Sequence, residues 1–204
     1  MANPTGAFGL RPVRHKNGAP WNGATVPCYC SASYATALYV GDPVVISLVT
    51  AEKDTSGFYR TINKSAGTDG IVVEGVIVRF DPNRDNLSQV YRPASQERIA
   101  HVCMDQTVIY HIRGDGGGTP SKTWIGINAV MIANSSGSTV TGLSGMMLDE
   151  GTTTAPDQNQ SMPLVIEGLA SMPDNSLGDN AIWEVSLNTF FNATGLVLGT
   201  TVTS

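Results

Sequence analysis

The chain has 204 residues, a length that usually forms one domain or two small ones. Only 14% of its residues are charged, against about 25% in an average soluble domain, and this disfavours exposed helices and favours β-structure with many turns. The net charge is −5 and every Lys and Arg lies at or before Lys122, so the chain lacks the basic surface of a nucleic-acid-binding protein.

Residues 1–12 have no charged start followed by an apolar stretch, so we expect no signal peptide. No apolar run approaches the roughly 18–20 residues of a membrane span, and no membrane partner is expected. An odd number of cysteines in a chain of this length predicts no disulfide framework. We therefore expect a protein that stays in a cytoplasm or leaves it inside a particle.

Residues 1–27 are predicted to form an extended arm, and residues 28–204 a single β domain. Glycines and prolines recur along residues 1–27, so this segment cannot form a regular helix and offers few donors to a β-ladder. Its candidate contact residues are large apolar or basic side chains: Phe8, Leu10, Arg11, Arg14 and Trp21. We expect the arm to grip a neighbouring subunit; the alternative is that it folds back as an edge strand of its own body.

Short β-strands separated by turns are predicted after the arm. The expected strand regions, in chain order, are 38–49, 70–80, 99–112, 129–133, 164–169 and 182–190. Within 99–112, apolar and polar residues alternate, which is typical of one half-buried strand. Long loops are expected near 114–122, 134–145 and 151–161, where Gly, Ser and Thr accumulate. This pattern predicts an all-β fold, a β-sandwich or barrel with a jelly-roll-like body.

One constellation resembles a metal site. Cys28 and Cys30 are two residues apart, as are His101 and Cys103, so each pair would point to one side of a strand. Four such ligands could surround Zn²⁺ if the two strands were neighbours. Structural zinc sites normally place their cysteines on tight turns instead, so we predict no metal and no cofactor here.

No catalytic residues are predicted. His101 and His111 are ten residues apart on the expected strand, and no positioned nucleophile accompanies them. The glycine-rich stretch 114–118 lacks the Lys-Ser/Thr of a phosphate loop, and the adjacent carboxylates Asp149 and Glu150 would point to opposite faces. A calcium-like spacing in the turn 81–86 is incomplete, because no closing glutamate follows. These features predict turns and packing rather than an enzyme.

Several segments together resemble a family of tailed-bacteriophage head proteins encoded near the major capsid protein. They are Gly6–His15, Trp21–Thr25, Leu38–Val45, Gly75–Phe80, Tyr91–Ser95, Thr141–Gly145 with Leu148–Asp149, and Pro173–Asn175 leading to Trp183–Asn188. The resemblance spans most of the chain, and no single segment carries a chemical signature. It implies a β-barrel or jelly-roll-like body and a role as a capsid cement or decoration protein, and it carries over no catalytic residue.

From this resemblance we expect a virion structural protein that binds the major capsid protein and itself, as a symmetric homo-oligomer, after assembly in the host cytoplasm. Low charge, extended arms and static contacts suit such a role, because many copies on a symmetric shell add modest contacts together. Two alternatives stay open. One is another virion component, such as a tail, connector or head-completion protein, and the other is a β-sandwich carbohydrate-binding module or enzyme.

Overall fold

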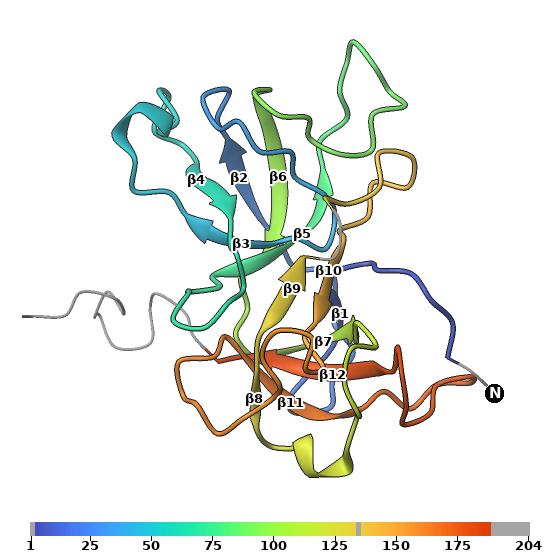
Figure 1. Cartoon of the computed structure of the whole chain (residues 1–204). Helices are drawn as coiled ribbons and strands as arrows, with labels where there is room; N and C mark the ends of the chain where they lie inside the picture. The colour runs from blue at the N-terminus through green and yellow to red at the C-terminus, as the bar shows by residue number, and fades with distance from the viewer. Residues whose placement is uncertain (1–2, 134–135, 189–204) are drawn as a thin grey trace, which may run out of the picture.

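The computed structural model describes residues 3–133 and 136–188. These residues form short strands and two single-turn 3-10 helices (Figure 1). The elements are β1 (Arg11–His15), β2 (Val26–Cys30), β3 (Pro43–Ile46), η1 (Thr50–Glu52), β4 (Arg60–Lys64), β5 (Gly75–Phe80), β6 (Arg98–Cys103), β7 (Val108–Arg113), η2 (Lys122–Trp124), β8 (Asn128–Ala129), β9 (Met131–Ala133), β10 (Met146–Leu148), β11 (Leu164–Leu169) and β12 (Ile182–Leu187). The predicted all-β class is confirmed.

Strands from residues 26–103 close into a five-stranded barrel with the order β2-β4-β3-β5-β6, in the upper half of Figure 1. β2 and β4 pair in parallel and the other neighbours pair antiparallel. Small and branched side chains fill the interior, among them Cys28, Val44, Ile62, Ile77 and Val102. A narrow barrel leaves room only for side chains, so this interior is a packed core.

A five-stranded antiparallel sheet with the order β1-β7-β12-β11-β8 forms the lower half of Figure 1. Its inner face buries Tyr110 and Trp183 completely. The two-stranded pair β9–β10 contributes Met131, Met146 and Leu148 to the same core. Fully burying side chains of this size contributes about 1.5–3 kcal/mol each, so this core is the larger source of stability.

The two cores share strands. In β5, Val76 belongs to the core under the five-stranded sheet, whereas the next residue, Ile77, belongs to the barrel core. In β6, Cys103 belongs to the core under the five-stranded sheet and Val102 to the barrel core. Because successive strand residues point to opposite faces, one strand can serve both cores, and the barrel and the sheet are joined by packing.

Residues 99–112 do not form the single strand that was predicted. They divide into β6, which belongs to the barrel, and β7, which belongs to the five-stranded sheet, with a turn at 104–107 between them. In that turn the Asp105 carboxylate accepts hydrogen bonds from the backbone N–H of Thr107 and from its hydroxyl, both at 2.8 Å. Short polar side chains that bond the backbone in this way favour turns over a continued ladder.

Most other predicted strands appear within shorter bounds. The prediction at 164–169 matches β11, and 182–190 becomes β12 as far as Leu187, while Phe190 lies outside the described residues. The region 70–80 contains only β5, and 129–133 contains β9 and the end of β8. Irregular segments at 114–121, 136–145 and 149–163 occupy the places where long loops are expected.

The described part of the expected arm lies along the body. β1 pairs antiparallel with β7, with Arg11 opposite His111 and His15 opposite Val108. Residues 11–15 of the expected arm are thus an edge strand of the sheet, which is the alternative considered above, and the expected boundary at residue 27 falls within β2. Within the described residues, no helix has the length and apolar character to cross a membrane.

Candidate functional site

The five candidate contact residues of the N-terminal segment are engaged within the chain. Leu10 is only 1% exposed and belongs to the core under the sheet. Trp21 packs against the same core. Arg14 makes an ion pair of 2.5 Å with Glu184 on β12. Burial and pairing account for these three side chains without any external partner.

Four of the five candidates nevertheless gather around one small groove. Phe8, Leu10, Arg11 and Trp21 line a space of about 240 Å³ at the junction between the barrel and the sheet. The guanidinium of Arg11 lies 4.9 Å from the centre of the Phe8 ring, a cation–π contact. Arg11 is also exposed, so it is the member of this set that a partner could reach directly.

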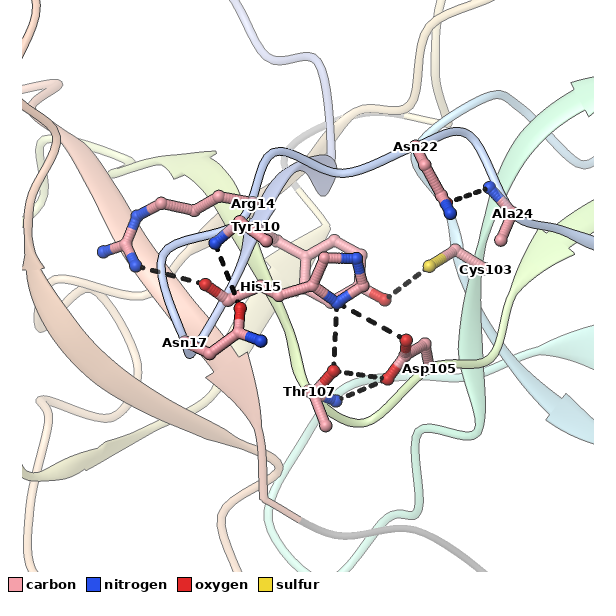
Figure 2. A network of polar contacts seen from close by, with 10 residues as sticks. Arg14, His15, Asn17, Asn22, Ala24, Cys103, Asp105, Thr107 and Tyr110 are labelled. Carbon is pink, nitrogen blue, oxygen red and sulfur yellow. Dashed lines mark hydrogen bonds and ion pairs between the residues drawn. The ribbon is translucent and has the colours of Figure 1, made fainter.

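Polar contacts fix the end of β1 to the turn between β6 and β7 (Figure 2). The His15 ring nitrogen Nδ1 lies 3.0 Å from the Thr107 hydroxyl and 3.5 Å from the Asp105 carboxylate. The Thr107 hydroxyl donates to Asp105, so its proton is not directed at the imidazole. This arrangement lacks an activated nucleophile and instead joins the N-terminal segment to the body.

The cysteine and histidine pairs do not converge, although β2 and β6 are neighbours. Cys28 and Cys30 point into the barrel core. His101 lies on the outside of the barrel, 2.8 Å from the Asp81 carboxylate. Cys103 lies in the other core and accepts a 3.3 Å hydrogen bond from the Tyr110 hydroxyl. Among the described residues, no group of three His, Cys, Asp or Glu side chains could hold a metal ion.

His101 and His111 lie in different sheets, since β6 belongs to the barrel and β7 to the five-stranded sheet. His111 lies 3.5 Å from Glu184, which also pairs with Arg14. Burial lowers the pKa of His111 below its usual value, and the bond to Glu184 opposes this effect. His101 and His111 thus make separate contacts with carboxylates on different sheets, His101 with Asp81 and His111 with Glu184.

Asp149 and Glu150 organise two loops. The Asp149 carboxylate accepts backbone hydrogen bonds from the loop that follows it, including one of 2.7 Å from Thr154. Glu150 accepts from the Trp183 indole at 2.8 Å and from the Gly116 backbone at 2.9 Å. Their acceptor atoms are occupied by structural donors, which favours a supporting role for both carboxylates.

Three segments in the upper half of Figure 1 each carry a large apolar side chain that is exposed to solvent. Phe58 is 84% exposed, Leu87 80% and Val140 86%. They lie in the segments 47–59, 81–97 and 136–145. The second and third segments touch, because Gly142 packs directly against Val90. Contiguous exposed apolar patches, unlike single exposed residues, commonly mark interaction surfaces.

These loops are held in place by internal hydrogen bonds. In the segment 47–59, the Asp54 carboxylate accepts from the backbone N–H of Ser56 and of Tyr59, both at 3.0 Å. In the segment 81–97, the Arg98 guanidinium donates to the carbonyls of Tyr91 at 2.5 Å and Gln89 at 2.9 Å. A loop that is already ordered loses less entropy when it binds a partner.

A fully buried arginine supports the same end of the barrel. The Arg92 guanidinium donates to the backbone carbonyls of Ser31, Thr36 and Gln96, the last two at 2.6 Å. It thereby ties the segment 31–37 to the segment 81–97. The planar guanidinium suits this task because it presents several donors in a fixed geometry.

Sequence reasoning missed Phe58, Leu87 and Val140 as surface candidates. Leu87 and Val140 are each a single large apolar residue within a stretch of small or polar residues, and Phe58 has only Tyr59 as a large neighbour. That signal was present, but an isolated apolar residue in a loop is also compatible with burial under the loop. Comparison with known family models, with curated proteins and with solved structures gives no match to this chain.

Proposed function

We propose that this chain is a virion structural protein that binds and stabilises the capsid shell of a tailed phage, as a cement or decoration protein. The sequence resemblance described above supports this role. The single observation that carries it is the set of loop segments, all in the upper half of Figure 1, that present Phe58, Leu87 and Val140 to solvent. The proposed partners are the major capsid protein and further copies of this chain.

The physical argument rests on apolar area and copy number. Each 100 Å² of apolar surface that docks contributes on the order of 2.5 kcal/mol before ordering costs. The ordering cost is reduced here because hydrogen bonds already hold the loops. Repetition over a symmetric shell then adds the contacts of many copies, so a modest patch suffices for stable attachment.

The N-terminal segment has a smaller part in this proposal than the sequence suggests. Leu10 lies in the core under the sheet, Trp21 packs against that core, and Arg14 is paired with Glu184. Arg11 keeps an exposed guanidinium beside the Phe8 ring. We assign to these two residues an auxiliary contact, since an exposed Arg can pair with a carboxylate in a bidentate way.

A binding experiment with shells that lack this chain tests the proposal. The full chain carrying Phe58→Asp and Leu87→Asp is mixed with such shells, which are then sedimented and their bound protein is quantified. We expect a loss of affinity of at least about tenfold, because charge replaces apolar contact at two loop tips. Binding of the double variant at the wild-type level would contradict the proposed surface.

Ile125 offers a matched control. It is 50% exposed and lies directly after η2, at the lower end of the molecule in Figure 1. The variant Ile125→Asp makes the same chemical change far from the barrel loops. It should bind shells like the wild type, whereas an equal loss in both variants would point to a general effect of added charge.

A further inference from the structure

A second and larger groove lies between the barrel and the β9–β10 pair. It has a volume of about 630 Å³. Its apolar lining comes from the barrel side and from the segment around β9 and β10. The apolar lining residues are Tyr34, Ala66, Val130, Met131, Ile132 and Met146. This size lies within the range of sites that enclose a ligand or a short peptide segment.

The charged groups in the lining are already paired inside the chain. The Lys64 ammonium lies 2.9 Å from the Asp42 carboxylate. The Asp69 carboxylate accepts a 2.9 Å hydrogen bond from the Asn159 amide, and Asp149 accepts from the backbone of the loop that follows it. Each charged group among the described lining residues therefore already has a partner, an ion pair for Lys64 and neutral hydrogen-bond donors for Asp69 and Asp149. The rest of the lining is largely apolar and best fits an uncharged, apolar occupant.

The described chain ends close to one wall of this groove. After β12, the backbone N–H of Asn188 donates to the Pro163 carbonyl at 2.8 Å, and its side-chain amide donates to the Gln160 carbonyl at 3.1 Å. The next residue along, Ser161, donates from its hydroxyl to Asp69, which lines the groove. Asn188 is thus connected with the groove wall through two hydrogen bonds, its own to Gln160 and that of the adjacent Ser161 to Asp69.

The remaining segment, residues 189–204, has the composition that the groove fits. It contains no Asp, Glu, Lys, Arg or His and no Pro. Its apolar residues are Phe190, Phe191, Ala193, Leu196, Val197, Leu198 and Val202. The other residues of the segment are small or uncharged polar ones, mostly threonine. Apolar and β-branched residues of this kind favour an extended conformation. Sixteen residues span up to about 50 Å when extended, which is ample reach from Asn188 to the groove.

We propose that apolar side chains from the segment 189–204 bind in this groove of their own chain; the volume of about 630 Å³ accommodates a few residues of the segment. Attachment at Asn188 holds the segment at an effective concentration in the millimolar range, about the value expected for a short flexible tether, so the chain's own segment outcompetes other occupants. Uncharged side chains then meet a largely apolar lining whose charged groups already have hydrogen-bond or ion-pair partners inside the chain. This inference is independent of the proposed role on a capsid, because it concerns only the chain itself.

Photo-crosslinking of the full chain tests the inference without fixing the register of the segment. Ile132, which lines the groove, is replaced by the photoreactive amino acid p-benzoylphenylalanine, and the products are mapped by mass spectrometry. We expect crosslinks to residues 189–204 within one chain, running as a monomer on a denaturing gel. Crosslinks that join two chains, or none to this segment, would overturn the proposal.

The same photoreactive residue at Val140 is the matched control, since Val140 is exposed and does not line the groove. It should give no crosslinks to residues 189–204. Amide hydrogen exchange adds a second measurement: exchange within 189–204 should be at least about tenfold slower than in an unstructured peptide, and Ile132→Asp should remove this protection while Val140→Asp keeps it. Unprotected amides throughout the segment in the wild-type chain would overturn the inference even if Ile132→Asp fails to fold.

Discussion

The indole N–H of Trp183 donates a 2.8 Å hydrogen bond to the carboxylate of Glu150, and both side chains are buried. This contact joins β12 to the start of the segment that follows β10. A second oxygen of Glu150 accepts from the backbone of Gly116. One carboxylate therefore links the sheet core to the glycine-rich loop, and its protonation state affects both.

Burial raises the pKa of Glu150 above its ordinary value of 4.5, and the bonds from Trp183 and Gly116 oppose that rise. Between the unfolded and the folded pKa, the folded state then binds more protons than the unfolded state, so stability from this group is lost as pH rises. We expect the free energy of unfolding of the wild type, relative to that of Glu150→Gln, to fall as pH increases from 4.5, measured by denaturant unfolding followed through Trp fluorescence. A relative free energy that rises with pH would mean that the hydrogen bonds outweigh burial.

Gly118 is required because its neighbour leaves no space for a side chain. A Cβ atom built on Gly118 would lie 1.5 Å from the backbone oxygen of Glu150. Gly118→Ala should therefore lower the free energy of unfolding by about 1–3 kcal/mol or more, since backbone must move. Gly168→Ala is the control, because nothing lies within 4 Å of its added Cβ, and it should be nearly neutral. Equal stability of both variants, measured by urea unfolding, would refute the packing of this loop.

Leu10 tests whether the N-terminal segment belongs to the body. Its side chain is almost fully buried in the core under the sheet, so Leu10→Ala should cost about 2–5 kcal/mol of stability. Thermal and urea unfolding measure the effect, and Ala7→Gly, at a partly exposed position four residues before β1, should change little by comparison. A free arm would instead leave stability unchanged on Leu10→Ala.

The three cysteines should be unreactive in the folded protein. Burial raises the pKa of Cys28 to about 11 and that of Cys30 to about 12, and it also raises the pKa of Cys103. The thiolate is the reactive form, so a thiol reagent at pH 8 should label the native chain very slowly and all three sites rapidly in denaturant. Fast labelling of any of them under native conditions would show that its core is open.

Alternating patterns predicted the strands that lie inside one sheet. The segments 164–169 and 182–187 alternate in the register that their neighbours require, so β11 and β12 could be located from the sequence. The pattern at 99–112 also alternates, yet the chain changes sheets at 104–107. Alternation indicates which side chains are buried but not which strand packs against them. The passage of the chain from the barrel to the five-stranded sheet at 104–107 was therefore not predictable.

Features that depend on distant partners were the least predictable. The parallel pairing of Cys28 with Arg60 that closes the barrel has no local signal. The glycines and prolines of residues 1–27 suggested an arm, but they also allow the sharp turns that return Leu10 to the core. Phe58 on its loop tip became a candidate only when the packing around it was known.

Cryo-electron microscopy of an intact particle that contains this chain tests the central claim most directly. The account predicts that the chain occupies the capsid shell on the order of hundreds of copies, as shell symmetry requires, with the barrel loops that carry Phe58, Leu87 and Val140 against the major capsid protein. A location restricted to the tail or the connector, or a shell in which those loops face only solvent, would contradict it.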